Sequence, residues 1–102
     1  MSSVTVPQHM VALEQANRRR LYRADVKRGI GSLPTSAGLR EVAGKLDDPM
    51  LDSMELGELL GAVRRVGPSK IVSLCRRAEL YPGKRIGSLT GRQRDVLRGV
   101  LS

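Results

Sequence analysis

Residues 55–65 read ELGELLGAVRR, and their apolar side chains recur with the spacing of an α-helix. The recurrence is i, i+3, i+4 and i+7, which places these side chains on one face of a helix. They are Leu56, Leu59, Leu60 and Val63. We therefore predict a helix over this stretch that turns its apolar face into a core.

The segments on either side repeat this pattern and are separated by helix-breaking residues. Residues 67–69 and 81–83 read as turns, and residues 29–34 read as a linker. No stretch shows the period of two that is typical of strands. The predicted fold class is therefore all-α, with helices over residues 7–27, 35–46, 49–53, 55–65, 68–78 and 90–101.

Side chains that accept hydrogen bonds from free backbone N–H groups mark several of these helix starts. The expected N-caps are Thr35 or Ser36, Asp48 before Pro49, and Thr90, whose partner in a capping box is Gln93. The last helix is expected to bury Val96, Leu97, Val100 and Leu101. Cys75 lies on an apolar stripe and is expected to be a core residue.

The composition excludes several classes of function. The chain has 102 residues, 18 Lys and Arg against 10 Asp and Glu, and a net charge of +8, which indicates one domain and a polyanionic partner. Two tyrosines are the only aromatic residues, which disfavours modules that stack bases on aromatic side chains. With one Cys and one His, we expect no metal site, no cofactor and no enzyme activity, since a catalytic pair would have to use His9.

The charge is segregated along the chain. Residues 1–35 carry a balance of +4, residues 36–62 a balance of −4, and residues 63–102 a balance of +8. Two basic stretches thus flank an acidic middle, a pattern that favours binding of a polyanion. We expect the acidic middle to face away from that partner.

Two local features are candidate phosphate contacts. Residues 67–70 form a glycine turn that opens a helix, where Gly67, Ser69 and Lys70 could meet a phosphate, although Pro68 donates no N–H. A plain helix start with a solvated lysine is the alternative. The second feature brackets the capping box and comprises Lys84, Arg85, Arg92 and Arg94. Arg92 in a first helical turn opposes the helix dipole unless an anion compensates it.

The N-terminal helix carries a third basic group. Its members are Arg18, Arg19, Arg20 and Arg23, which read either as a nucleic-acid-binding arm or as a solvated helix face. No stretch has the composition of a signal peptide or a membrane helix, so we expect a cytoplasmic protein without a membrane partner. We also expect a monomer.

Four blocks of the sequence, taken in order, carry a resemblance to a known family. They are Met54-x-Leu56-x-x-Leu59-Leu60-x-x-Val63, Val66-Gly67-x-x-Lys70, Pro82-x-Lys84-Arg85-Ile86-x-x-Leu89 and Arg92-Gln93-Arg94. Between about Ala16 and Leu101 the chain resembles the actinobacterial type of integration host factor. That family is nucleoid-associated and differs in fold from the heterodimeric enterobacterial protein of the same name.

The resemblance implies an N-terminal helix packed on a small helix–two-turns–helix domain of the type found in a ribosomal protein. It divides the chain into a basic N-terminal helix with a linker, residues 1–34, and a DNA-binding domain, residues 35–102. It implies binding of double-stranded DNA with little sequence specificity, bending or compaction of DNA in the nucleoid, and support of phage integration.

Carried over by residue, the resemblance places the turn from Gly67 to Lys70 against the phosphate backbone. It places Lys84 and Arg85 in a DNA-contacting stretch that Arg92 and Arg94 flank. Two positions depart from the family pattern: Pro68 replaces an amide donor, and Gly87 stands where a third arginine is frequent. The alternatives are an RNA-binding or ribosome-associated protein, and a phage-encoded adaptor that binds a host protein through the acidic middle.

Overall fold

The computed structural model describes residues 8–102, with side chains from Met10 onward. Five α-helices and two 3-10 turns make up this part of the chain, which contains no β-strand. The elements are α1 (Gln8–Gly31), α2 (Thr35–Gly44), η1 (Pro49–Leu51), α3 (Leu56–Gly61), α4 (Pro68–Arg77), η2 (Ile86–Ser88) and α5 (Gly91–Leu101). The predicted all-α class is confirmed.

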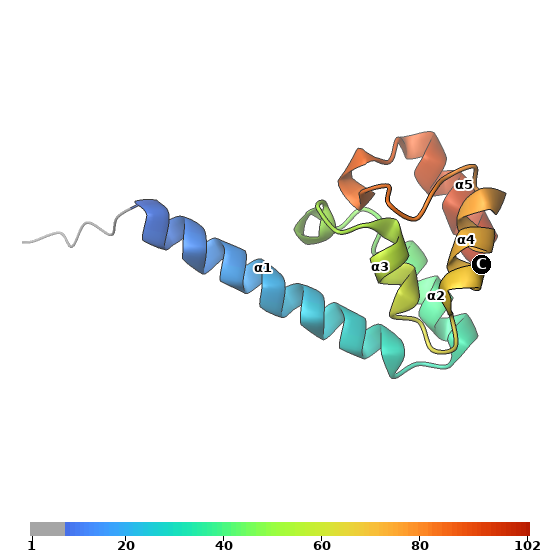
Figure 1. Ribbon diagram of the computed structural model, residues 1–102, viewed down its shortest axis with the longest axis horizontal. Coiled ribbons are helices and arrows are strands. Elements are labelled where there is room, and N and C mark those ends of the chain that lie inside the picture. The colour runs from blue at the N-terminus through green and yellow to red at the C-terminus, as the bar shows by residue number, and fades with distance from the viewer. Residues whose placement is uncertain (1–7) are drawn as a thin grey trace, which may run out of the picture.

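Helix α1 is a long rod that projects from the cluster formed by α2 to α5 (Figure 1). Every described side chain from Met10 to Leu21 is exposed, and burial begins only at Tyr22. The C-terminal part of α1 packs on η1 and α2. The molecule therefore consists of a helical domain and a helix of which about half stands free.

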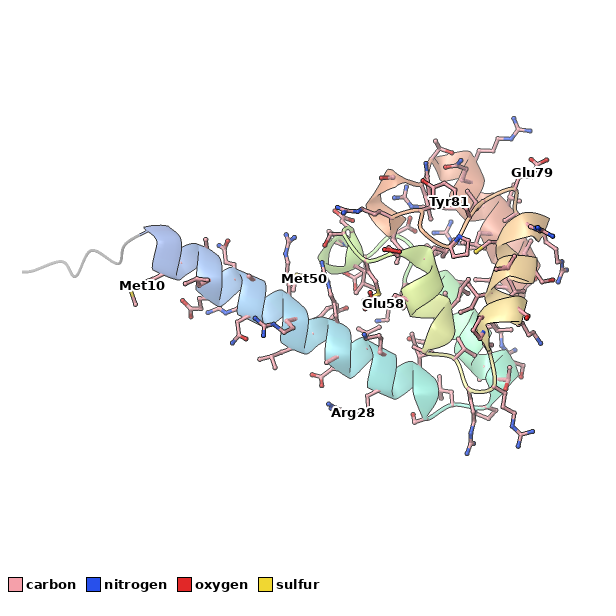
Figure 2. All side chains as sticks on the ribbon, viewed as in Figure 1. Met10, Arg28, Met50, Glu58, Glu79 and Tyr81 are labelled. Atoms are coloured by element: carbon pink, nitrogen blue, oxygen red, sulfur yellow. The ribbon has the colours of Figure 1, made fainter. Side chains whose placement is uncertain are left out.

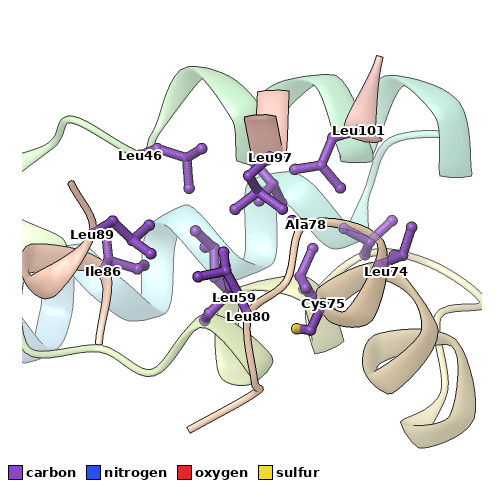
Figure 3. Close-up of a cluster of buried hydrophobic side chains, with 14 of the residues drawn as sticks. Leu46, Leu59, Leu74, Cys75, Ala78, Leu80, Ile86, Leu89, Leu97 and Leu101 are labelled. Atoms are coloured by element: carbon purple, nitrogen blue, oxygen red, sulfur yellow. The ribbon is translucent and has the colours of Figure 1, made fainter. Parts of the chain in front are cut away.

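The core is wholly apolar and draws on every helix, as Figure 3 shows for its central part. The predicted inner face of the 55–65 stretch is fully buried, and Cys75 is 0% exposed, so both predictions are confirmed. In α5, Leu97 and Leu101 are buried and Val100 is half-buried, as expected. Val96 is 43% exposed, so its predicted burial is wrong: it lies one position away from the side of α5 that faces the core.

Helix α1 extends four residues further than predicted and takes in most of the expected linker. Its residue Ile30 is only 1% exposed and packs in the core, and this burial outweighs the low helix propensity of Gly29 and Gly31. The expected start near Pro7 lies outside the described residues. The division of the chain after residue 34 stays a prediction, but Ile30 belongs to the same core as α2 to α5.

The helix starts show two correct predictions and one wrong one. Asp48 caps η1, and Thr90 with Gln93 forms the capping box of α5. The expected cap of α2 is wrong because Pro34 occupies the N-cap position and no side chain caps the helix. The hydroxyl of Thr35 instead donates to the carbonyl oxygen of Arg64 at 2.8 Å.

Helix α3 is shorter than predicted, because the chain turns after Gly61. Val63 and Val66 are nevertheless buried in this turn, so the apolar period continues although the helix does not. Arg65 closes the turn with a φ of 65°, a left-handed conformation that is costly for any residue with a Cβ. The sequence period therefore located the buried residues but not the helix end.

Candidate nucleic-acid interface

Residues 82–87, the clamped segment, are held against residues 52–57 by backbone hydrogen bonds. Glu55 and Arg85 lie opposite each other in an antiparallel bridge. The bonds run from Leu56 N to Lys84 O and Gly57 N to Pro82 O, both 2.8 Å, from Gly87 N to Asp52 O, 2.9 Å, and from Ile86 N to Met54 O, 3.0 Å. The backbone under Lys84 and Arg85 is therefore fixed by partners about 30 residues away in sequence.

Two glycines make this close approach possible. A Cβ at Gly57 would lie 2.9 Å from the Cβ of Pro82, and one at Gly87 would lie 2.9 Å from the Cβ of Asp52. Real Cβ atoms essentially never come so close, so both positions require glycine. At position 87, where the family resemblance leads one to expect arginine, packing against Asp52 leaves no room for a side chain.

Three predicted cations lie on or beside the clamped segment. Ile86, 0% exposed, anchors the segment, while Lys84 is half-buried and Arg85 is exposed. Arg92 is exposed in the first turn of α5, behind the capping box. None of the three forms an ion pair with the described residues.

Two carboxylates border this group of cations. Glu55 is the cross-strand neighbour of Arg85, and the two side chains lie on one face of the bridge without forming an ion pair. Glu79 lines a shallow hollow together with Arg92 and Val96. The three cations outnumber the two carboxylates, so the net charge of this group is positive but smaller than the cations alone would give.

Arg94 lies two residues after Arg92 but is used inside the domain. Its guanidinium donates to the carbonyl oxygen of Leu46 at 3.1 Å and to that of Ile86 at 3.4 Å. It also lies 3.4 Å from a carboxylate oxygen of Asp47, and its side chain is only 22% exposed. These contacts give Arg94 a structural role that joins α5 to the segments before η1 and in η2.

The turn from Gly67 to Lys70 lies at the other end of α4. Gly67 occupies the N-cap position, Pro68 follows it, and no side chain caps the helix. Ser69 and Lys70 are exposed. The loop before α4 and the clamped segment lie at opposite ends of this helix (Figure 1), which is about 15 Å long at 1.5 Å per residue, so the structure does not merge the two predicted sites.

The arginines of α1 differ in their surroundings. Arg18 pairs with Glu14 at 3.1 Å, whereas Arg19 and Arg20 are exposed and form no ion pair with the described residues. Arg23 donates to the carbonyl oxygen of Met50 at 3.3 Å and also to the hydroxyl of Ser53. The side chain of His9 lies outside the described residues.

The acidic middle of the sequence neutralises cations of both flanking segments. Glu58 pairs with Lys27 of α1 at 2.8 Å, and Asp47 pairs with both Arg94 and Arg98 of α5. Part of the charge segregation in the sequence is therefore explained by ion pairs that join the acidic middle to α1 and α5 in the folded protein.

Asp48 also joins the acidic middle to α1. It accepts a hydrogen bond from the hydroxyl of Tyr22 and another, at 2.9 Å, from Met50 N. The bond to Asp48 raises the pKa of Tyr22, as do burial and the charge of that carboxylate. The neutral phenol is therefore the form that holds α1 to the domain.

Four further exposed arginines lie outside the three basic groups named from the sequence. They are Arg64, Arg65, Arg76 and Arg77. With Lys70, Lys84, Arg85 and Arg92 they make eight cations between residues 64 and 92 that have no ion pair with the described residues. Glu79 is the only acid in that stretch. The partners of Arg94 are distant in sequence, so no local signal could have separated these arginines from Arg94, whereas Arg98 has a local partner in Asp95, three residues earlier, at 3.1 Å.

A reactive cysteine, a metal site and a membrane-spanning helix have less support than a phosphate-binding surface. Burial raises the pKa of the Cys75 thiol, which keeps it protonated and unreactive. Within residues 8–102, no three His, Cys, Asp or Glu side chains gather as metal ligands would. No helix in the same range is both long and apolar enough to cross a membrane.

No protein-family model, curated protein or solved structure matches the chain. The resemblance to the actinobacterial integration host factor therefore rests on the four sequence blocks and stays a prediction.

Proposed function

We propose that the protein binds double-stranded DNA through its backbone phosphates, with little sequence specificity. One observation carries this proposal: the clamped segment holds Lys84 and Arg85 on a backbone fixed by four hydrogen bonds, and neither cation has an ion-pair partner among the described residues. Arg92 is the third cation of this surface. Because the backbone that carries Lys84 and Arg85 is already fixed, phosphate binding need not order it, which lowers the entropic cost of binding.

The chemistry of the surface supports phosphate contacts over reading of bases. Long cationic side chains are the groups that contact phosphate oxygens, which position a protein on DNA without reading its sequence. Tyr81, which is 61% exposed, is the only aromatic side chain near the clamped segment that is available for stacking. We therefore propose that the surface binds phosphates and does not read bases.

The remaining features of the proposal rest on the family resemblance. They are a location in the nucleoid, bending or compaction of DNA, and support of phage integration. Fluorescence energy transfer between dyes at the two ends of a short duplex tests bending, because a bent duplex brings the dyes closer. An unchanged transfer efficiency at saturating protein would reject bending and leave binding intact.

The alternative of a protein adaptor depended on the acidic middle. Asp47, Asp48 and Glu58 are engaged within the chain, which leaves fewer free carboxylates for a partner protein. RNA binding has no observation of its own in its favour and is an outcome of the test below.

The test is a gel-shift titration on random-sequence duplex DNA at several salt concentrations, with duplex RNA as competitor. If about five phosphates are neutralised, the logarithm of the binding constant should fall with that of the salt concentration with a slope of about −4 to −5. A slope near zero would reject the electrostatic mechanism. If duplex RNA competes as well as DNA, the proposed ligand becomes duplex nucleic acid in general instead of DNA.

A further inference from the structure

Tyr81 is an aromatic residue that the fold leaves open to solvent. It is 61% exposed, and Figure 2 shows it on the domain, well away from α1. The other tyrosine, Tyr22, is half-buried where α1 meets the domain, and its hydroxyl bonds to Asp48. The sequence contains no phenylalanine and no tryptophan. Tyr81 therefore carries the only ring of these three residue types that is exposed on the described part of the chain.

The backbone on both sides of Tyr81 is fixed. Leu80, which precedes it, lies in the core and is only 9% exposed. On the other side, Lys84 N donates to the carbonyl oxygen of Tyr81 at 3.1 Å and closes a β-turn over Pro82 and Gly83. The clamped segment begins within this turn and is fixed by its own four hydrogen bonds. A ligand of Tyr81 therefore need not order the backbone that carries the ring, which lowers the entropic cost of binding.

The cations of the clamped segment lie beside this ring. Lys84 stands at the other end of the same turn, so its Cα lies within about 7 Å of the Cα of Tyr81. Neither Lys84, Arg85 nor Arg92 has an ion pair with the described residues. An exposed apolar side chain that occurs singly needs no explanation. An aromatic ring beside free cations is, however, the combination with which proteins bind unpaired nucleotides, because cations contact the phosphates and the ring stacks on a base.

A carboxylate marks the space beside the ring as unsuitable for phosphate. A Cβ at Gly83 would lie 3.3 Å from Cε2 of Tyr81 and 3.9 Å from Oε1 of Glu55, so the edge of the ring and this carboxylate lie near one point. A carboxylate repels a phosphate but does not repel an uncharged base. The space beside Tyr81 therefore suits an uncharged aromatic group, whereas the cations suit phosphates.

From this arrangement we propose that Tyr81 stacks on an unpaired base, so that the protein prefers a duplex with a short single-stranded gap to a continuous duplex. In a continuous duplex the neighbouring bases cover both faces of each base, and a side chain gains access only at the cost of unstacking. A gap presents base faces without that cost. Stacking uses the face of a base and not its hydrogen-bonding edge, so specificity for sequence stays low. This inference rests on the proposed DNA binding and adds the kind of DNA that is preferred.

Competition between two DNAs tests the preference. Both duplexes have the same length, sequence and ends, but one lacks a few nucleotides in the middle of one strand. The full chain should bind the gapped duplex about tenfold more tightly, which is in the lower part of the range for one base stacked on one aromatic side chain. Equal affinity would overturn this inference and leave the proposed function intact. Absence of binding to either DNA would overturn both.

Two variants of Tyr81 test whether the ring causes the preference. Tyr81→Leu keeps an apolar side chain but removes the aromatic face, and the two affinities should then agree within about twofold. A gap also makes DNA more flexible, but a preference caused by flexibility would survive this substitution, and its survival would overturn the inference. Tyr81→Phe keeps the ring and should keep the preference. Its loss in Tyr81→Phe would also overturn stacking, because only the hydroxyl is removed.

Leu21→Ala is the matched control. Leu21 is 59% exposed, close to the value for Tyr81, but it lies on α1. This variant should keep the tenfold preference for the gapped duplex. A loss of the preference here would show that any exposed apolar side chain has this effect, and would overturn the role of Tyr81. Unchanged melting temperatures would show that the variants are folded.

A fluorescent base reports the stacking directly. An adenine analogue whose emission falls when an aromatic ring stacks on it is placed at an unpaired position of the gap. Saturation with the original chain or with Tyr81→Phe should lower the emission, whereas saturation with Tyr81→Leu should not. The same emission with all three proteins would overturn the inference, even if the gapped duplex binds more tightly.

Discussion

The clamped segment and the free half of α1 are both basic, but they are held in different ways. The clamped segment owes its conformation to four hydrogen bonds with residues 52–57 and to two glycines at close contact. The free half of α1, residues 10–21, depends on its own helical hydrogen bonds, because all of its side chains are exposed. The comparison teaches that a basic sequence becomes a positioned surface only where distant parts of the chain fix its backbone.

The largest effect should come from filling the close contact of the clamped segment. Gly87→Arg introduces the residue that the family resemblance leads one to expect, but its Cβ collides with Asp52. We expect a loss of about 3 kcal/mol in the free energy of unfolding, measured by urea denaturation. Gly99→Ala is the control, because a Cβ there meets no atom within 4 Å, and it should stabilise α5 by about 0.5–1 kcal/mol. A stable Gly87→Arg variant would show that the clamp is loose.

The next effect concerns DNA binding by the clamped segment. Lys84→Ala with Arg85→Ala should weaken binding about thirtyfold at physiological salt and flatten the salt slope by about 2, since two phosphate contacts are lost. The melting temperature should change little, because neither side chain has an ion-pair partner within the part of the chain that the structure describes.

Its matched control is Arg40→Ala with Lys45→Ala in and after α2. These two cations also lack ion pairs with the described residues, and their loss changes the net charge equally. An equal loss of affinity in both double variants would mean that only net charge matters. The double variant Arg18→Ala with Arg19→Ala tests in the same way whether cations on the free half of α1 contribute to DNA binding.

Tyr22 marks the point where the free half of α1 gives way to the part that packs on the domain. Tyr22→Phe removes the hydrogen bond to Asp48 and should lower the free energy of unfolding by about 1 kcal/mol. The folded protein raises the pKa of this phenol, so the contribution is complete below its ordinary pKa of 10.0 and disappears as pH rises through the folded-state value. Denaturation of the two proteins between neutral pH and pH above 10 should therefore show their stabilities converging. A constant difference would contradict the role of the phenol proton.

Two non-glycine residues in left-handed conformations flank α4, and their replacement separates stability from binding. Arg65 has φ 65° and Glu79 has φ 59°, so glycine at either position should stabilise the fold by about 0.5–1 kcal/mol. Arg65→Gly removes a free cation and should weaken DNA binding, whereas Glu79→Gly removes the acid beside Arg92 and should strengthen it. Thermal melting and the gel shift measure the two effects. Changes of affinity in the same direction would show that stability, not charge, controls binding.

The smallest effect should come from removing the free half of α1. Deletion of residues 1–20 should change the free energy of unfolding by less than about 0.5 kcal/mol, because none of the described side chains it removes is buried. Deletion through residue 28 also removes Tyr22 and Val26, which pack on the domain, and should be clearly destabilising. Equal stability of the two truncations would mean that α1 does not belong to the core before Ile30.

The sequence alone determined where the helices lie, though not where α1 and α3 end, because helix period, turns and caps act over a few residues. Leu56, Leu59 and Leu60 are buried as their spacing predicts, and the capping box at Thr90 forms as its residues require. Val96 and the cap of α2 were wrong, because neighbours distant in sequence decide which flank of a helix is covered and what Thr35 bonds to.

Only the tertiary structure decided which cations are available to a ligand. Arg92 and Arg94 are two residues apart, yet Arg92 is exposed while Arg94 bonds to carbonyls of Leu46 and Ile86. The same holds for Gly87, whose missing side chain is explained by the approach of Asp52. The physical reason is that hydrogen bonds, ion pairs and steric contact depend on distance in space, whereas sequence patterns record only distance along the chain.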